Sequence, residues 1–157
     1  FAAPWYISLI EIDAGGMYDT QAEEMGKVFV STELGGGGST TPATAEIGKR
    51  GVHNFLVHAG ILDANPVIPS SPPVKLDMQQ DNAFVFSEHN GLLEPCVGLG
   101  DPVSKGDLIA LVYSTERTGS KPVKYLAASD GIIVGRNFPS LIKIGDFMNV
   151  IAKVVQD

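Results

Sequence analysis

The sequence predicts an α/β segment followed by an all-β segment of barrel or sandwich type, and three observations support this fold class. Residues 27–60 follow the order strand, glycine-rich loop and helix, which is half of a βαβ unit. The stretch "ANPVIPSSPPV" then interrupts regular structure with four prolines, Pro66, Pro69, Pro72 and Pro73. Two similar glycine-aspartate hairpins follow the prolines. We therefore expect one domain over residues 1–65 and a second over residues 66–157.

Composition limits the partners that this protein can have. The 157 residues are 44% hydrophobic, and 11 basic against 18 acidic residues give a net charge of -7. Such a chain can bury a core. Its charge argues against nucleic acid or an anionic membrane as partner, since both select clustered Lys and Arg.

The single cysteine and the first residues bear on the cellular compartment and on whether the chain is a fragment. One cysteine, Cys96, excludes an internal disulfide and favours a reducing compartment, so we expect the cytoplasm. Because Cys96 stands in an apolar run, we expect a buried small hydrophobe and not a nucleophile. The chain opens on Phe1 without Met or a basic region, which indicates a fragment and not a secretory signal.

The first segment begins with a possible strand and a short helix. "SLIEI" (residues 8–12) fits a strand or the end of a buried helix. "YDTQAEEMG" predicts a helix with Asp19 or Thr20 as N-cap, a capping box between Thr20 and Glu23, and a stop at Gly26.

A strand and a longer helix surround the glycine tract. "KVFVSTEL" (residues 27–34) has the apolar, β-branched start of a buried strand. The next helix is predicted from Thr41 as N-cap and Pro42 as first residue to Gly60. The apolar stripe of this helix is expected to consist of Val52, Phe55, Leu56 and Ala59.

The second segment contains an internal repeat. "GLLEPCVGLGDPVSKGDLIALV" starts at Gly91 and "GIIVGRNFPSLIKIGDFMNVIA" starts at Gly131. Each copy ends in a glycine-aspartate hairpin, in which Gly supplies the positive φ and Asp caps the turn. Such a duplication is typical of a small biotinyl/lipoyl-like barrel or a flattened sandwich.

The glycine tract after Glu33 raises the question of chemistry. "ELGGGGSTTP" lacks the lysine of a phosphate-binding P-loop and the third glycine of a dinucleotide fingerprint, so nucleotide binding is disfavoured. A tight strand-to-helix turn remains. There Glu33 is either a general base at a strand's carboxyl end or a solvated glutamate. Serine-hydrolase chemistry is disfavoured because Ser31, Ser39 and Thr40 lack a positioned histidine.

Residues 11–62, with "TELGGGG" and "GKRGVHNFLVHAGIL", resemble the later part of the catalytic domain in the succinylglutamate desuccinylase/aspartoacylase family. The nearest subgroup is that of bacterial deacylases related to N-acetyl-diaminobutyrate deacetylase. The duplicated hairpins resemble the family's C-terminal barrel-like domain. The resemblance implies a zinc-carboxypeptidase-like mixed sheet domain, a small N-acyl substrate, zinc as cofactor and Glu33 as the catalytic base.

The chain departs from the family pattern in its metal ligands. The family binds zinc through H-x-x-E and a later His, whereas this chain has only His53, His58 and His89 and no H-x-x-E. His53 and His58 are five residues apart on one helix and project differently, so we expect surface or packing roles. The resemblance therefore implies that the zinc ligands precede this chain and that the isolated chain is inactive.

Two other classes of function stay open. The β-rich part is a carrier domain if Lys121 or Lys124 bears biotin or lipoate, although neither lysine has the usual sequence context. It is alternatively a noncatalytic interaction module. Its partners would then be a second copy of the chain or the missing N-terminal portion of the same enzyme.

Overall fold

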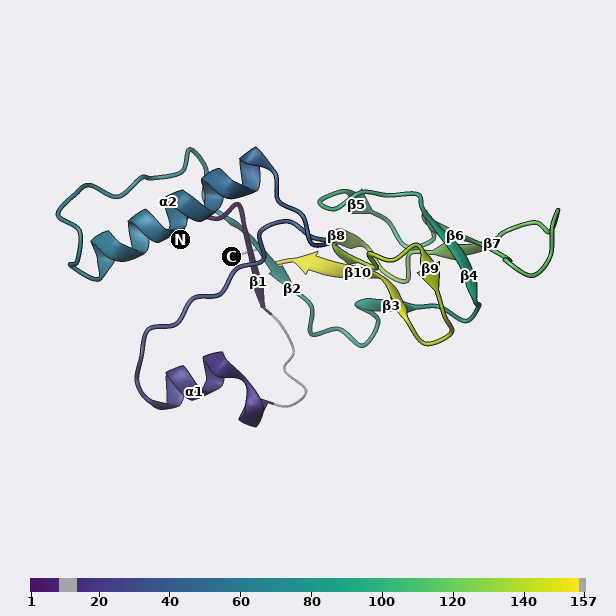
Figure 1. The fold of residues 1–157 in the computed structure, drawn as a ribbon, viewed down its shortest axis with the longest axis horizontal. Coiled ribbons are helices and arrows are strands. Elements are labelled where there is room, and N and C mark those ends of the chain that lie inside the picture. The colour runs from purple at the N-terminus through teal and green to yellow at the C-terminus, as the bar shows by residue number, and fades with distance from the viewer. Residues whose placement is uncertain (9–13, 156–157) are drawn as a thin grey trace. The chain divides into compact units, whose positions relative to one another are not determined.

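In the computed structural model, residues 1–8 and 14–155 are described. Two compact units are formed, Phe1–Tyr6 with Ile10–Val74 and Ile7–Leu9 with Lys75–Asp157. Helices belong to the first unit and most strands to the second (Figure 1). No helix in the described part of the chain is long and apolar enough to cross a bilayer. The division into domains of residues 1–65 and 66–157 stays a prediction.

The first unit contains a 3-10 turn η1 (Ala14–Gly16) and helices α1 (Tyr18–Glu24) and α2 (Pro42–His58). Strand β1 (Trp5–Ser8) begins in the first unit and ends in the second. Of the predicted element "SLIEI", only Ser8 is described, and it ends β1; the remainder lies outside the described residues.

Helix α1 ends as predicted but begins earlier. Its N-cap is Met17, which has no side-chain cap, so the predicted caps Asp19 and Thr20 are wrong. The reason is local: the Asp19 carboxylate accepts a hydrogen bond from the neighbouring Thr20 N–H (2.8 Å), inside the first turn. At the other end Gly26 has φ +67°, which closes the helix as expected.

Helix α2 has the predicted ends. Thr41 is the N-cap, Pro42 opens the helix, and Gly60 follows the C-cap with φ +70°. The predicted apolar stripe is in large part exposed in this structure, since Val52 is 56% and Phe55 is 37% exposed. The close contacts lie at glycines instead: a Cβ at Gly51 would overlap the ring of Phe1.

The predicted buried strand over residues 27–34 is wrong. These residues form no strand, and Val28 and Val30 are 69% and 48% exposed. A buried strand is stabilised by ladder hydrogen bonds to neighbouring strands, and the described residues offer this segment no partner strand. Phe29 instead contacts the ring of Tyr18 edge-on, with ring centroids 5.4 Å apart.

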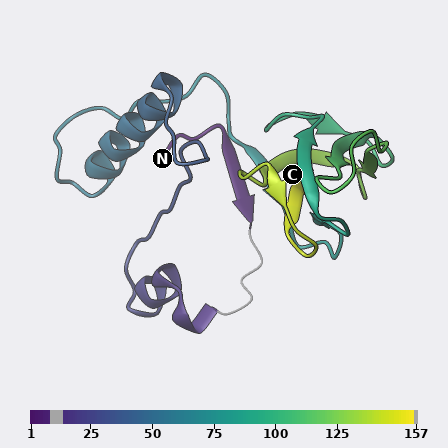
Figure 2. The same cartoon turned by 45° about the vertical axis from the view of Figure 1, so that its right-hand side comes forward.

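The second unit is a two-sheet β structure, which Figures 1 and 2 show in two views that differ by a 45° turn. One sheet has the order β1-β2-β10-β8-β5 with β3 also paired to β10, and the other has the order β7-β6-β4-β9. The bounds are β2 Val74–Asp77, β3 Phe84–Phe86, β4 Gly91–Pro95, β5 Pro102–Val103, β6 Leu108–Tyr113, β7 Val123–Leu126, β8 Gly131–Arg136, β9 Leu141–Ile142 and β10 Phe147–Val154.

The core of this unit lies between the two sheets. Ile109 of β6 packs with Ile133 of β8 and Ile151 of β10, and all three side chains are fully buried. Residues from both sheets thus share one apolar cluster, which is the arrangement of a sandwich. The described strands of this segment pair as antiparallel neighbours, as expected for a β-rich barrel or sandwich. The zinc-carboxypeptidase-like mixed sheet domain expected for the first segment stays a prediction.

The internal repeat corresponds to a structural duplication. The first copy gives β4, β5 and β6, and the second gives β8, β9 and β10. The short strands are exchanged, because β5 pairs with β8 and β9 pairs with β4. The turn chemistry is also as predicted: Gly106 and Gly145 have φ +97° and +90°. The adjacent carboxylates of Asp107 and Asp146 accept turn N–H groups at 2.8 and 2.9 Å.

Candidate functional site

Glu33 lies at the entrance of a tight glycine turn. Gly35, Gly37 and Gly38 have φ values of +103°, +63° and +70°, a region that side chains disfavour. The turn closes where the Ser39 N–H donates to the Gly36 carbonyl (3.2 Å). A Cβ at Gly35 would lie 2.9 Å from the Ser39 carbonyl oxygen. The glycines therefore form the tight turn that the sequence predicts.

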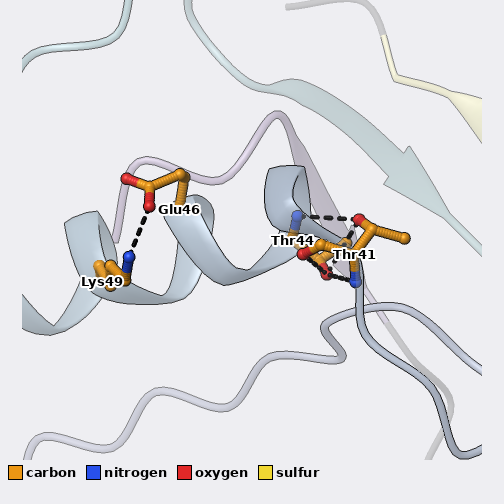
Figure 3. Close-up of polar contacts among 4 residues, drawn as sticks. All are labelled: Thr41, Thr44, Glu46 and Lys49. Atoms are coloured by element: carbon orange, nitrogen blue, oxygen red, sulfur yellow. Dashed lines mark hydrogen bonds and ion pairs between the residues drawn. The ribbon is translucent and has the colours of Figure 1, made fainter.

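The turn is joined to helix α2 by threonine hydroxyls (Figure 3). The Thr41 N–H donates to Thr44 Oγ1 (2.9 Å), and the Thr44 N–H donates to Thr41 Oγ1 (3.2 Å), which is a reciprocal capping box. One turn further along, Lys49 Nζ lies 2.6 Å from Glu46 Oε1. The hydrogen bond from Lys49, aided by its charge, lowers the pKa of Glu46.

Leu34, the residue that follows Glu33, packs against helix α2. The Leu34 side chain is half-buried and reaches Gly48, where a Cβ would lie 2.9 Å from Leu34 Cδ1. Glu33 itself is exposed, and its carboxylate makes no hydrogen bond or ion pair within the described part of the chain. An exposed carboxylate without partners is compatible with both predicted roles, a general base and a solvated glutamate.

The three histidines lie in separate surroundings. His53 Nε2 is 3.0 Å from the Asn65 carbonyl oxygen, and His58 is exposed in the last turn of α2. His89 Nδ1 is 2.8 Å from the Tyr125 hydroxyl in the second unit. Among residues 1–8 and 14–155, no group of three or more His, Cys, Asp or Glu could hold a metal ion. These residues do not by themselves fit a zinc site.

The sequence did not indicate the hydroxyl network around Tyr125. The Glu88 N–H donates to the Tyr125 hydroxyl (2.9 Å), beside the His89 contact. A surface pocket of about 260 Å³ lies next to this network and includes His89, Ser114 and Lys121 among its lining residues. Tyr125 stands in a strand far from the "SEHNG" turn, so no local pattern could have linked the two.

Cys96 contradicts its predicted burial. It is exposed, because Pro95 ends β4 and Cys96 begins the turn beyond it. Its backbone remains attached to the sandwich, since the Cys96 N–H donates to the Ile109 carbonyl (2.9 Å). Partial burial, and then the charge of Glu94, raise the pKa of the Cys96 thiol, so it is a poor nucleophile at neutral pH.

Sequence comparison finds a relative with a named activity. No family model matches this chain. It is 47% identical, over 156 residues, to the N-alpha-acetyl-L-2,4-diaminobutyric acid deacetylase of Halomonas elongata, covering 99% of this chain and 46% of the relative. The chain thus spans about half the length of this curated relative.

Solved structures of related proteins also resemble this chain in fold and in sequence. The product-bound ectoine utilization protein EutE (DoeB) from Ruegeria pomeroyi matches with a TM-score of 0.90 and 49% identity, over 97% of this chain and 46% of that one. A succinylglutamate desuccinylase/aspartoacylase from Rhodobacter sphaeroides matches with a TM-score of 0.87 and 26% identity, over 99% and 47%. The chain is thus homologous, over nearly its whole length, to members of the succinylglutamate desuccinylase/aspartoacylase family.

Proposed function

We propose that this chain is the C-terminal part of a zinc-dependent deacylase that hydrolyses the amide bond of an N-acyl amino acid or a related small molecule. The observation that carries the proposal is the 47% identity, over 99% of the chain, to an N-acetyl-diaminobutyrate deacetylase. Because the chain covers about half of that relative, the activity belongs to the whole protein. Its cytoplasmic location and its assembly into oligomers are further parts of the proposal.

In this proposal Glu33 is the general base. Its carboxylate takes a proton from the attacking water as the water oxygen bonds to the acyl carbon. The same proton then passes to the amide nitrogen as the C–N bond breaks, which releases a carboxylic acid and an amine. The resemblance of "TELGGGG" to the family supports this role, and the anchored Leu34 beside Glu33 restricts its position. A positioned base contributes about 10²–10⁴ in rate.

The zinc ion of this proposal supplies Lewis-acid polarisation of the acyl carbonyl and acidifies water. The described residues contain no ligand set for it, so its ligands would come from other residues of the enzyme. We accordingly expect a chain of residues 1–157 alone to be inactive.

The test is Glu33→Gln in the full-length protein, with N-alpha-acetyl-L-2,4-diaminobutyrate as substrate and amine release as readout. We expect kcat to fall by at least about 10², with the zinc content and unfolding midpoint unchanged. Glu46→Gln is the matched control, since Glu46 is also an exposed glutamate of the first unit. Activity of Glu33→Gln within twofold of wild type would remove Glu33 from the mechanism.

A further inference from the structure

The Tyr125 hydroxyl connects strand β7 to the turn that follows β3. The Tyr125 ring packs against two apolar clusters of the sandwich core, which anchor it. From this position its hydroxyl oxygen lies 2.9 Å from the Glu88 nitrogen, 2.8 Å from His89 Nδ1 and 3.4 Å from Ser87 Oγ. One anchored side chain thus meets three consecutive residues of the turn.

The hydroxyl of Ser87 has its own hydrogen already committed. Ser87 Oγ lies 2.7 Å from the His89 carbonyl oxygen, and a carbonyl oxygen can only accept, so the hydroxyl donates there. In return Ser87 Oγ accepts from the His89 N–H (3.2 Å). Any hydrogen bond between the two hydroxyls must therefore be donated by Tyr125.

The single hydrogen of the Tyr125 hydroxyl then decides which nitrogen of His89 carries a proton. The Tyr125 oxygen accepts from the Glu88 N–H, because a main-chain N–H can only donate. Its own hydrogen has two possible acceptors, His89 Nδ1 at 2.8 Å and Ser87 Oγ at 3.4 Å. Because O–H···O bonds usually measure about 2.5–3.0 Å, the Nδ1 acceptor is favoured. A neutral imidazole that accepts at Nδ1 carries its proton on Nε2.

The opposite tautomer of His89 fits these contacts less well. With the proton on Nδ1, the Tyr125 oxygen would have to accept two N–H groups, one from Glu88 and one from His89. The Tyr125 hydrogen would then be left with the distant Ser87 Oγ. Since the Tyr125 side chain is half-buried and Ser87 is only 2% exposed, a poorly made hydrogen bond here is costly.

We propose that the Tyr125 hydroxyl holds neutral His89 in its Nε2–H tautomer, which makes Tyr125 the positioning residue of this imidazole. His89 lines the surface pocket of about 260 Å³, and its Nε2 has no hydrogen-bond partner in the part of the chain that the structure describes. His89 thus enters the pocket wall as a donor at Nε2. Such a donor matches an oxygen acceptor and disfavours a metal ion, which binds an unprotonated nitrogen. The inference uses residues of the second unit alone and does not depend on Glu33.

The test is ¹⁵N NMR of the full-length protein labelled with ¹⁵N-histidine. The spectra are recorded at about pH 9, above the range of about pH 5–8 in which histidine usually changes its charge. His89 signals are assigned by their loss in His89→Gln. A ring nitrogen resonates at clearly different positions with and without its proton, so the two shifts give the ratio of the tautomers. His58 is the internal reference, because it is exposed and has no hydrogen-bond partner among the described residues.

We expect the ratio of Nε2–H to Nδ1–H to be higher at His89 than at His58 by at least about twofold, the factor that corresponds to one weak net hydrogen bond. A His89 that is mainly Nδ1–H, or a ratio no higher than that of His58, would overturn the proposal. This comparison is made within the wild-type protein and needs no variant.

Tyr125→Phe removes the hydroxyl and keeps the ring in the core. It should lower the tautomer ratio of His89 to that of His58. Amide hydrogen exchange at Glu88 should also become faster, because its N–H loses its acceptor. A merely structural role of the tyrosine ring would leave the tautomer ratio unchanged.

Tyr113→Phe is the matched control for Tyr125→Phe. Tyr113 is also a tyrosine of the sandwich, but its hydroxyl donates to Glu94 Oε2 (2.7 Å) and not to the turn. It should alter neither the His89 ratio nor the exchange at Glu88. A His89 ratio that Tyr125→Phe leaves at its wild-type value would refute the role of the hydroxyl, and the wild-type comparison decides the matter even if this variant fails to fold.

Discussion

The two equivalent glycines of the repeat, Gly91 and Gly131, allow a strong test of the sandwich. A Cβ at Gly91 would overlap the carbonyl oxygen of Tyr113, and one at Gly131 would overlap that of Ala152. Both contacts are far below 3.0 Å, which real Cβ atoms essentially never show. The obstructing atoms belong to the main chain of the paired strand, so they cannot move aside as a flexible side chain could. Substitution must therefore displace a strand.

The size of the effect of Gly131→Ala follows from two terms. Overpacking costs about 1–3 kcal/mol, and the rigid main-chain obstacle argues for the upper end. Replacing Gly by Ala restricts the unfolded chain and returns about 0.4–1 kcal/mol. We expect a net loss of about 2 kcal/mol for Gly131→Ala and a similar loss for Gly91→Ala. For a domain of about 60–100 residues this lowers the unfolding midpoint by about 8–16 °C.

Thermal and urea unfolding followed by far-UV circular dichroism measure this loss. Gly36→Ala is the matched control, because a Cβ there meets nothing within 4 Å and its φ is not positive. We expect its midpoint to stay near wild type. Stability of Gly91→Ala and Gly131→Ala equal to that of Gly36→Ala would refute the close strand approach and the structural equivalence of the two repeats.

Two further predictions concern the first unit and the free thiol. Thr41→Ala should destabilise helix α2 by about 1 kcal/mol in urea unfolding, whereas Thr41→Ser should retain the cap; equal stability of both variants would contradict the capping box. Alkylation of Cys96 by iodoacetamide should rise with pH to a midpoint above about 8.5, the value of a free thiol, because its raised pKa withholds the thiolate. Glu94→Gln should lower this midpoint by removing a nearby negative charge, and a midpoint below that of free cysteine would contradict the assignment.

Features governed by neighbouring residues were predictable from the sequence. The ends of α2 depend on Thr41, Pro42 and Gly60, whose side chains or φ angles act within one helical turn. The hairpin turns depend likewise on Gly106 and Gly145 and the aspartates beside them. Glu33 could be identified as a candidate base by resemblance, and its catalytic role stays a prediction.

Features governed by distant partners were not predictable. The segment 27–34 has the composition of a buried strand, but a strand also requires a paired neighbour, and the described residues provide none. Burial of Cys96 failed for a related reason: the end of β4 at Pro95, and not the apolar run, decides where that side chain lies. The Tyr125–His89 contact joins residues 36 apart in the chain.

The sequence by itself determined the caps of helix α2, the glycine turns and the duplication of the glycine-aspartate hairpins, because each is encoded within a few adjacent residues. Only the tertiary structure decided how the two copies combine. The pairing of β8 with β10 sets Asn149 opposite Arg136, and β5 and β9 are exchanged between the copies. Both arrangements require contacts between strands that no local pattern specifies. Long-range strand pairing thus built the sandwich.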